Sequence, residues 1–389
     1  MEQSYLDDGE SELFNNIDME DLIGPEPSAA VENLALVLSP SVIDDPDVII
    51  ISPSDIFSNG SRTTTSPRKL AQKKTPLETL RPRYFFVSDF VAYTWCSQKA
   101  YFSILNPGFE EMIQEIKSVS DPTKKIQPVM KIGTAIHVTR ELAVHAPPKP
   151  VKTCGPEDLF AIRLLNTFTL LHALILGKPV EREIPVFGMP LDLGILIFGK
   201  IDEINLDHTT GMITLSETKT RNSEREPRPP QQIGHRLQVM LYKRLLEDII
   251  QGKMNWRLIL NILHLKSEKK FSEAVQKEII CSGLSADHLD LLFRQVTAMT
   301  AALSGEIVLN VEYVYQGTKK TFLTRTVEYD EEWLREQMTD FVHVWTMRKP
   351  MLGAPVHEAW KCHDCSFGDI CEWKQARIPR RNTDGTWTR

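Results

Sequence analysis

Asp202, Glu217 and Lys219 have the side-chain types and the spacing of a metal site that could hydrolyse a phosphodiester. They lie in the segment Phe198–Lys219, which we expect to form two antiparallel strands joined by a polar turn. Side chains alternate along a strand, so every second residue from Ile213 to Lys219 points to one face. Two carboxylates can hold Mg²⁺, and a lysine can assist the attacking water. A solvated hairpin edge is the competing interpretation of this stretch alone.

Two segments with helical periodicity add polar side chains that share a face. One segment carries His137 and Glu141 four residues apart, and the other carries Gln238 and Tyr242 at the same spacing. Residues four apart are neighbours on a helix surface. A single histidine on a helix is more often structural, and a tyrosine at this spacing is more often packed. The spacing by itself therefore assigns neither pair a function.

Three cysteines near the end of the chain have the spacing of metal ligands: Cys362, Cys365 and Cys371. A Cys-x-x-Cys turn brings two sulfurs together, so the three thiolates can face one centre. A zinc ion would take its fourth ligand from His357 or His363, whereas an iron–sulfur cluster prefers a fourth cysteine. From the spacing alone, both interpretations stay open.

The fourth cysteine of a cluster would come from Cys96, Cys154 or Cys281. Cys96 is the best candidate because it lies in an aromatic segment where the folded body begins. A cluster that joins Cys96 to the C-terminal cysteines would clasp the two ends of one domain. We expect Cys154 and Cys281 to be free thiols.

Charge is distributed unevenly along the 389 residues. The whole chain has a formal net charge of −7, but residues 1–60 contain fourteen acidic side chains and no lysine or arginine. The remainder carries 45 basic and 38 acidic side chains. An acidic tail is thus joined to a basic body, and a basic body permits binding of a polyphosphate such as a nucleic acid.

The sequence shows no membrane span, signal peptide or mitochondrial presequence. No run of about 18 apolar residues is present, and the N-terminus has neither the pattern of a signal peptide nor the basic composition of a mitochondrial presequence. We therefore expect no membrane association and a location in the nucleus, with the cytosol as a second possibility and the mitochondrion not excluded. Cysteines packed at metal-ligand spacing favour a reducing compartment.

Composition divides the chain into three parts: a disordered tail over residues 1–78, a folded domain over 79–376 and a C-terminal tail over 377–389. The first part is acidic and then rich in serine, threonine and proline. Within it, Leu13–Ile23 could fold on a partner, and Asp47–Asp55 is similar to a SUMO-interaction motif that adds a strand to its partner. The basic segment Pro67–Lys74 is either a nuclear-import signal or a solvated linker.

The folded part mixes strands and helices, which indicates an α/β or α+β domain around one sheet. A short strand near Tyr84 precedes a helix that Ser88 could cap and that carries Cys96. Further helices are expected over residues 130–145, 158–176, 231–250, 286–303 and 331–348, and further strands over 180–187, 258–265 and 308–315.

Taken in order along the chain, these residues resemble the exonuclease V family, a RecB-like branch of the PD-(D/E)xK nucleases that carries an iron–sulfur cluster. The resemblance covers residues 84–373. The matching residues are Gly133, His137 and Glu141; the strand Arg182–Gly188; Asp202; Glu217, Thr218 and Lys219; Gln238 and Tyr242; and Cys96, Cys362, Cys365 and Cys371. Each motif is common alone, but the complete set in this order is specific.

The resemblance implies a restriction-endonuclease-like core, a mixed central sheet flanked by helices, and a 4Fe–4S cluster that clasps the N- and C-terminal segments. It also implies a single-strand-specific DNA exonuclease that uses Mg²⁺, releases short oligonucleotides and acts in DNA repair. We expect a monomer that binds single-stranded DNA. A single-strand-binding protein and SUMO are candidate partners of the acidic tail.

The same resemblance suggests a role for each site residue. His137, Asp202, Glu217 and the Thr218 carbonyl would bind the metal, and Lys219 would orient and acidify the attacking water. Glu141 would bind a second metal or hold His137, and both roles stay open. Gln238 and Tyr242 would contact DNA or support Lys219, and Arg221 is a candidate phosphate contact.

Two other classes of protein fit parts of the sequence. One is a structure-specific endonuclease with a zinc knuckle, which would cut circular DNA. The other is a nucleic-acid-binding scaffold without catalytic activity. The intact set of Asp202, Glu217 and Lys219 argues against the scaffold.

Overall fold

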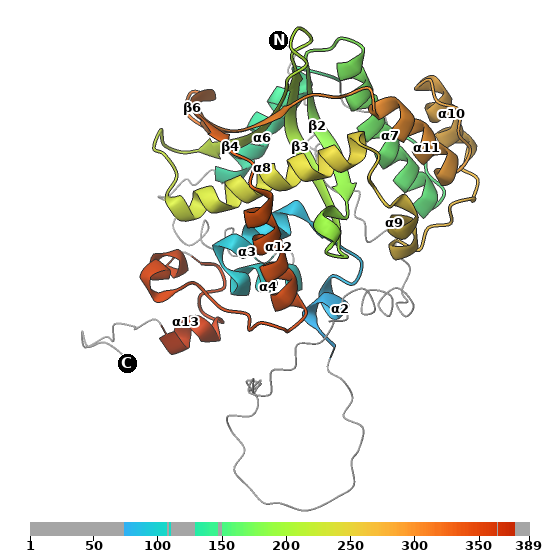
Figure 1. Cartoon of the computed structure of the whole chain (residues 1–389). Helices are drawn as coiled ribbons and strands as arrows, with labels where there is room; N and C mark the ends of the chain where they lie inside the picture. Colours follow the sequence, from blue (N-terminus) through green and yellow to red (C-terminus); the bar gives the residue numbers. More distant parts are fainter. Residues whose placement is uncertain (1–73, 107–108, 110–128, 147–149, 364, 378–389) are drawn as a thin grey trace, which may run out of the picture.

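A computed structural model describes residues 74–106, 109, 129–146, 150–363 and 365–377. Its centre is a six-stranded mixed sheet with helices on both faces (Figure 1). The strand order is β1-β3-β4-β5-β6, and β2 also pairs with β3. The strands are β1 (Tyr84–Phe86), β2 (Val180–Gly188), β3 (Leu196–Leu206), β4 (Ile213–Arg221), β5 (Ile307–Tyr315) and β6 (Lys320–Val327).

The described helices connect and cover these strands. They are α2 (Pro76–Leu80), α3 (Val87–Trp95), α4 (Ser97–Leu105), α6 (Val129–Leu142), α7 (Pro156–Ile175), α8 (Pro229–Ile250), α9 (Trp256–Ile262), α10 (Glu273–Cys281), α11 (Leu289–Thr300), α12 (Glu331–Trp345) and α13 (Glu372–Arg377), with short 3₁₀ turns η3 (Pro190–Asp192) and η4 (Val356–Cys362).

Alternation along the central strands divides the core into two clusters. Val186 and Ile197 pack with α3, α8 and α12, whereas their neighbours Phe187 and Phe198 pack with α7, α9 and α11. Adjacent residues of a strand point to opposite faces. In a sheet that helices cover on both faces, consecutive residues of a strand are therefore apolar. The predicted α/β class with a mixed sheet flanked by helices is confirmed.

The central hairpin forms as predicted, but its two strands separate before they end. β3 and β4 are antiparallel, and their last paired residues towards the site are Glu203 and Ser216. On the same edge of β3, strand β1 pairs in parallel with residues Leu196 to Phe198. Within the described part of the chain, residues 199–202 of β3 therefore have no partner strand on this edge, and Asp202 lies where the sheet forks.

Two glycines allow helices to approach the sheet closely at this fork. A Cβ atom on Gly133 of α6 would lie 2.8 Å from Thr220 Oγ1 on β4. A Cβ atom on Gly199 of β3 would lie 2.6 Å from Tyr242 on α8 and 2.7 Å from Val87 on α3. Any larger residue would displace these helices, so both glycines set how near the helices come to the sheet.

Two local predictions are wrong. Leu258–Leu265 was expected to be a strand, but residues 256–262 form the helix α9, whose Asn255 side chain accepts a hydrogen bond from Leu258 N at 3.2 Å. A short apolar run has no periodicity that separates a strand from a buried helix, and the cap decides. Ser88 is not the cap of the next helix: α3 begins at Val87, and Asp89 accepts from Phe86 N at 2.8 Å.

The other predicted helices and strands are confirmed to within a few residues at their ends. The helix expected to carry Cys96 is divided there, because Cys96 is extended between α3 and α4. Helices α2, α10 and α13 and strand β6 were not predicted. Leu77 of α2 is buried, so packing begins before residue 79. The predictions for the N-terminal motifs at 13–23 and 47–55 lie outside the described residues, as does nearly all of 67–74.

Among the described helices, α7 is long and apolar enough to cross a membrane, judged only by its length and composition. Half of its apolar window is buried inside the fold. Its buried side chains Phe160 and Phe168 belong to the core beside α11, and Leu171 and Leu174 belong to the core on the other face of the sheet. The core helix of a soluble protein has the same properties, so this helix is weak support for a membrane span.

Candidate active site

The fork between β3 and β4 brings the two predicted carboxylates together. Extending the ladder by one residue from the pair Glu203–Ser216 sets Asp202 opposite Glu217. Beyond that pair β4 has left β3, and Thr218 N instead donates to Asp202 Oδ2 at 2.8 Å. The Asp202 side chain is 12% exposed and that of Glu217 is 5% exposed. Two carboxylates therefore face one another with little access to water.

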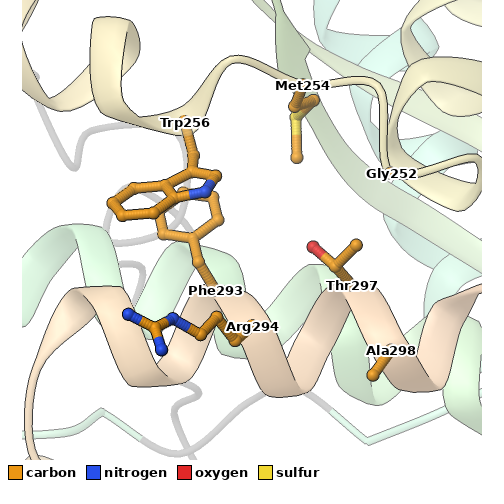
Figure 2. Close-up of a pocket in the computed structure, with 7 residues that line it drawn as sticks. All are labelled: Gly252, Met254, Trp256, Phe293, Arg294, Thr297 and Ala298. Carbon is orange, nitrogen blue, oxygen red and sulfur yellow. The ribbon is translucent and has the colours of Figure 1, made fainter.

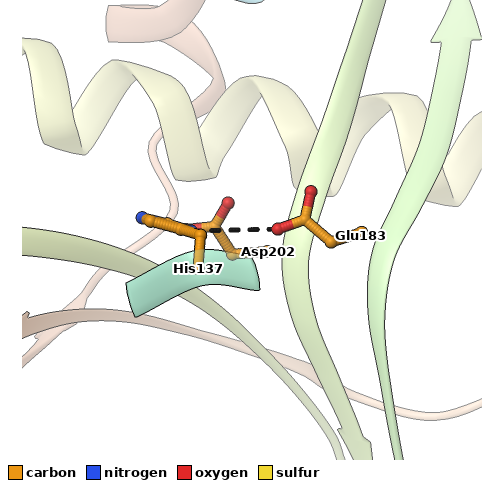
Figure 3. Close-up of side chains that lie close together, drawn as sticks. All are labelled: His137, Glu183 and Asp202. Carbon is orange, nitrogen blue, oxygen red and sulfur yellow. Dashed lines mark ion pairs between the residues drawn. The ribbon is translucent and has the colours of Figure 1, made fainter. Parts of the chain in front are cut away.

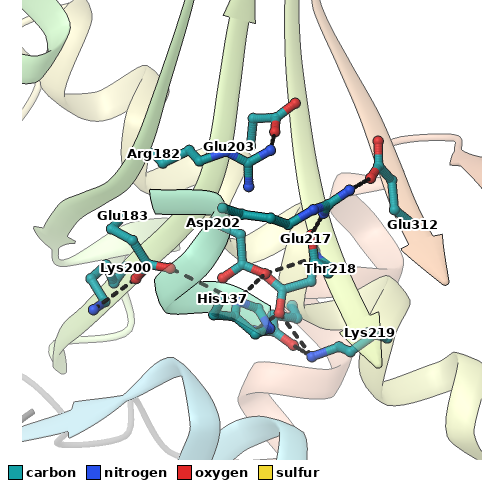
Figure 4. A network of polar contacts seen from close by, with 12 residues as sticks. His137, Arg182, Glu183, Lys200, Asp202, Glu203, Glu217, Thr218, Lys219 and Glu312 are labelled. Carbon is teal, nitrogen blue, oxygen red and sulfur yellow. Dashed lines mark hydrogen bonds and ion pairs between the residues drawn. The ribbon is translucent and has the colours of Figure 1, made fainter. Parts of the chain in front are cut away.

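Glu217, Lys219 and Gln238 form a closed set of hydrogen bonds. Figure 4 shows Glu217 and Lys219 side by side. Lys219 Nζ lies 2.8 Å from Glu217 Oε1 and 2.7 Å from Gln238 Oε1. Gln238 Nε2 donates to the same Glu217 Oε1 at 2.9 Å. The other oxygen, Glu217 Oε2, is buried and has no hydrogen-bond partner among the described residues. A buried carboxylate oxygen without a partner is costly, and a cation would satisfy it.

His137 reaches this site from α6 (Figure 3). Its Nδ1 atom lies 3.6 Å from Asp202 Oδ2 and 3.8 Å from Glu183 Oε1. His137, Glu183 and Asp202 each offer a ligand atom, and these atoms lie within 4.8 Å of one another. The arrangement of these three side chains is therefore compact enough for a metal ion.

Glu183 was not predicted as a site residue. It lies on β2 between Arg182, which pairs with Glu203, and Ile184, which pairs with Ile201, so it is opposite Asp202 on β3. Lys200 Nζ contacts its Oε2 at 2.7 Å. The only sequence signal was a carboxylate inside a segment that matches the family, and neither composition nor spacing showed that it faces Asp202.

The pKa values reflect crowding of negative charge. Burial, and then the nearby charge of Glu217, raise the pKa of Asp202 to about 7. The Glu183 carboxylate, 3.8 Å from Nδ1, raises the pKa of His137 against the effect of burial. Burial opposes ionisation of Glu183, but His137 and Lys200 outweigh it and lower the pKa. A cation would relieve the repulsion at Asp202, so the electrostatics as well as Glu217 Oε2 fit a divalent metal.

Arg140 fixes the helix that carries His137. Its guanidinium donates to Thr218 Oγ1 at 2.6 Å and to Glu312 Oε2 at 3.0 Å, which ties α6 to β4 and β5. A second ion pair, Arg182 with Glu203, joins β2 to β3 beside it (Figure 4). With the close approach at Gly133, these contacts set the position of His137 over the fork.

Three predicted site residues lie outside the group of side chains around Asp202 and Glu217. Glu141 follows His137 by one turn, and burial, followed by the charge of Glu183, raises its pKa. Tyr242 is buried, accepts from Gln238 Nε2 at 3.3 Å, and packs against Gly199. Arg221 ends β4, and its charge acts on His235 and Tyr313 rather than on the carboxylates.

The four predicted cysteines come together in a pocket that none of these carboxylates lines. Cys96, Cys362, Cys365 and Cys371 line one small pocket of about 20 Å³ with Lys99 and Lys374. Burial, and then the charges of the other three cysteines, raise the pKa of Cys362. Cys154 and Cys281 are exposed and do not line this pocket.

Contacts between distant segments hold this cysteine pocket closed. Gln98 Nε2 donates to Met351 O at 2.9 Å, and Lys361 Nζ donates to Trp95 O at 3.1 Å. The rings of Trp95 and Trp360 meet edge to face at 5.4 Å. The segment around Cys96 is thus attached to the C-terminal segment by contacts that do not involve sulfur.

A larger pocket lies elsewhere, between α11 and the segment that joins α8 to α9 (Figure 2). It has a volume of about 350 Å³, and Trp256 stacks on Phe293 in its wall. Arg294 also lines it, but its guanidinium is paired with Asp290. None of its lining residues belongs to the carboxylate cluster or to the cysteine pocket.

The fold and the site define a class of protein: a mixed α/β domain in which buried carboxylates, a lysine and a histidine meet where two strands separate. The family model of exonuclease V, described as a 5′ deoxyribonuclease, matches residues 75–213, 207–288 and 282–374. The chain is 30% identical to exonuclease V of Danio rerio over 306 residues. This alignment covers 78% of this chain and 74% of the relative. The chain belongs to the exonuclease V family and is therefore a nuclease, a hydrolase.

A solved structure described as the crystal structure of SSO0001 also matches. It is 13% identical, with a TM-score of 0.35, and the match covers 76% of this chain and 89% of that chain. This similarity is too low to support a conclusion about the site.

Proposed function

We propose that the chain is a Mg²⁺-dependent exonuclease specific for single-stranded DNA, which releases short oligonucleotides and acts in DNA repair. In this proposal the core is of the PD-(D/E)xK type and carries a 4Fe–4S cluster. The description of its family as a 5′ deoxyribonuclease supports digestion from the 5′ end.

The observation that carries the proposal is the pair Asp202 and Glu217 at the fork, with Glu217 Oε2 buried and unpaired and Lys219 on the same carboxylate. Asp202, Glu217, His137 and the Thr218 carbonyl are the groups that would hold Mg²⁺. The bound ion would polarise the phosphate and lower the pKa of a bound water. Oxygen donors suit this ion, and a histidine nitrogen is a less common ligand.

The chain's own residues supply the remaining requirements of hydrolysis. Lys219 is held by Glu217 and Gln238, so its ammonium has a fixed direction from which it can orient the attacking water. Gln238 also fixes Glu217 through Oε1, which directs Oε2 to the metal. Tyr242 supports Gln238 from inside the core. In this scheme Glu141 acts through its charge on the carboxylates at the fork. Arg221 contacts a phosphate further along the DNA strand.

The cysteine pocket supports an iron–sulfur cluster better than a zinc ion. Four sulfurs around zinc at about 2.3 Å would lie about 3.8 Å apart. In the described part of the chain, no three cysteines or histidines have ligand atoms within 4.8 Å of one another. An iron–sulfur cluster is larger and needs its sulfurs further apart than a zinc ion does, and the ammonium groups of Lys99 and Lys374 beside the cysteines would offset the negative charge of four thiolates. We assign the cluster a structural role.

Two alternatives remain for the test. A structure-specific endonuclease with a zinc knuckle is disfavoured by the sulfur spacing, and an inactive scaffold is disfavoured by the intact Asp202, Glu217 and Lys219. In the same proposal, the chain acts as a monomer in the nucleus and is not bound to a membrane. Its N-terminal segment binds SUMO or a single-strand-binding protein.

The test is cleavage of linear and circular single-stranded DNA by anaerobically purified full chain with Mg²⁺, with Asp202→Asn as the control. We expect cleavage of the linear strand alone, inhibition by a blocked 5′ end and no cleavage by the variant. Cleavage of the circle would instead favour the endonuclease. Binding without cleavage of either substrate, with the cluster intact, would favour the scaffold.

A further inference from the structure

We propose that Trp360 and Arg228 form a stacking platform, which binds one unpaired base of the DNA strand at a distance from the scissile phosphate. The inference rests on the proposed function, because it names a contact of the single-stranded substrate. It concerns binding, however, so it can be measured without cleavage.

Trp360 is the most exposed aromatic residue in the part of the chain that the structure describes. It is 36% exposed, whereas every other described phenylalanine, tyrosine and tryptophan is buried or half-buried. Val356, in the same 3₁₀ turn η4, is 63% exposed. Single apolar residues are common on protein surfaces, so exposure alone does not define a site. The contacts of the ring supply the further evidence.

Neighbouring side chains hold the Trp360 ring in place. It meets the ring of Trp95 edge to face at 5.4 Å. Lys361 Nζ donates to Trp95 O at 3.1 Å and lies 4.5 Å from the centre of the Trp95 ring. Both tryptophans lie within two residues of a cysteine of the pocket, Cys96 or Cys362. A ring that is fixed before binding loses little conformational entropy when a base stacks on it.

A guanidinium lies over this ring and offers a positive charge. Arg228 is the N-cap of α8, and its Cζ atom lies 4.7 Å from the centre of the Trp360 ring. Among the described residues it forms no ion pair, and Glu358 of η4 is already paired with Lys361 at 2.6 Å. A cation is held only weakly over an exposed ring. A base can therefore take this place while the guanidinium moves to the neighbouring phosphate.

The helix α8 sets the distance from the platform to the active site. Arg228 precedes Gln238 by ten residues, which corresponds to about 15 Å of helix. Gln238 Oε1 accepts from Lys219 Nζ at 2.7 Å, so Lys219 lies at the far end of this distance. Stacked bases of one strand are about 3.4 Å apart, so about four nucleotides separate the platform from the scissile phosphate, and fewer if the strand is extended.

The connection from β4 to α8 links the active site to the platform (Figure 1). It contains Arg221, Arg225 and Arg228, with Glu224 and Glu226 between them. Glu226 is paired with an arginine of β6 at 2.8 Å, so an excess of positive charge remains. Phosphate contacts here would position the strand, and stacking on Trp360 would add affinity that any base can supply. A paired base is already stacked between its neighbours, so the platform favours a single strand.

The test compares two strands of about 12 nucleotides that have the same number of phosphates. One carries thymine throughout, and in the other every base is replaced by an abasic sugar. Binding to the full chain is measured by fluorescence anisotropy, with Ca²⁺ in place of Mg²⁺ to prevent cleavage. We expect the natural chain to prefer the thymine strand. Trp360→Leu should reduce this preference by about 5–50-fold and leave the affinity for the abasic strand unchanged.

The matched control is Trp256→Leu. Trp256 also has an arginine near its ring, Arg257 at 5.1 Å, but it lies beyond the opposite end of α8. This variant should keep the natural preference, and Trp360→Phe, which retains a ring, should keep most of it. Strands of about two nucleotides are too short to reach the platform, so Trp360→Leu should not change their affinity.

Arg228→Gln tests the platform independently, because it changes an exposed side chain and leaves Trp360 in place. It should reduce the slope of log Kd against log salt by about 0.7, the contribution of one phosphate contact on a single strand. It therefore replaces Trp360→Leu if that variant does not fold. An unchanged salt dependence would overturn the inference.

The same conclusion would follow if Trp360→Leu kept the natural preference, or lost affinity equally for both strands, as a purely structural residue would. Failure of the proposed function gives a different result. Base-dependent binding at Trp360 without any cleavage in Mg²⁺ would refute the nuclease mechanism and retain the platform. Cleavage without a preference for bases would do the reverse.

Discussion

Asp202→Asn should stabilise the metal-free protein while it abolishes the nuclease activity. The side chains have nearly the same shape, and an asparagine oxygen can still accept the hydrogen bond from Thr218 N that Asp202 accepts at 2.8 Å. The substitution removes a negative charge that is buried beside Glu217. In the absence of a cation, that charge opposes folding.

The magnitude follows from the pKa of Asp202, which rises from 3.8 to about 7. A difference of about three pKa units, at about 1.4 kcal/mol each, sets an upper bound of about 4 kcal/mol. Relaxation around a neutral side chain and partial compensation by Lys219 reduce this value, so we expect about 1–3 kcal/mol. For a domain of this size, that corresponds to an increase in Tm of roughly 2–10 °C.

The sign of the pH dependence is fixed by the same values. Between pH 3.8 and about 7 the folded state keeps the Asp202 proton that the unfolded state has released. The stability of the natural chain therefore falls as pH rises through this window, whereas the variant has no such term. The advantage of the variant should be near zero at about pH 4, grow up to about pH 7 and stay constant above that.

The assay is thermal unfolding of both proteins at matched cluster content, with EDTA, across this pH range. Groups away from the fork titrate equally in both proteins and cancel in the difference, whereas the pKa of His137, which the carboxylates of Glu183 and Asp202 raise, changes with the substitution. Adding Mg²⁺ should reverse the order, because at about 1,000 times its Kd the ion stabilises only the natural chain, by about 4.1 kcal/mol. A variant that is less stable than the natural chain at pH 8 in EDTA, or a difference that does not change with pH, would refute the reasoning.

Three further predictions concern the cluster, the lysine and the helix over the fork. Cys365→Ala should lose iron and lower the Tm, whereas Cys154→Ala, which changes an exposed thiol, should do neither; equal iron content in both would contradict the structural role. Lys219→Met should reduce kcat by about 10²–10⁴-fold with little change in DNA affinity, measured by single-turnover cleavage, and a change in affinity alone would contradict its role. Gly133→Ala places a methyl group 2.8 Å from Thr220 Oγ1. It should lower the free energy of unfolding by about 1–3 kcal/mol and weaken Mg²⁺ binding, measured by thermal unfolding with and without the ion. An unchanged response to Mg²⁺ would show that the position of α6 does not matter for metal binding.

The sequence determined the elements whose signals are local. The hairpin, the helices α6, α7, α8, α11 and α12, and strands β2 and β5 follow from periodicity over a few residues. It also determined the order of the motifs, because side-chain types such as those of Asp202, Glu217 and Lys219 are read directly. Where the local signal was ambiguous, as at residues 258–265, a single cap decided for a helix.

Only the tertiary structure decided which of these residues meet. Glu183 faces Asp202 because β2 pairs with β3 in one register, and a local backbone distortion at Glu183 accompanies that pairing. Cys96 rather than Cys154 joins the C-terminal cysteines because α3 and α4 dock on the C-terminal segment. Such contacts depend on packing between segments far apart in the chain, and no periodicity over neighbouring residues contains that information. The sequence alone therefore determined the chemical groups and their elements, and the folded structure decided the shape and the charge of the site.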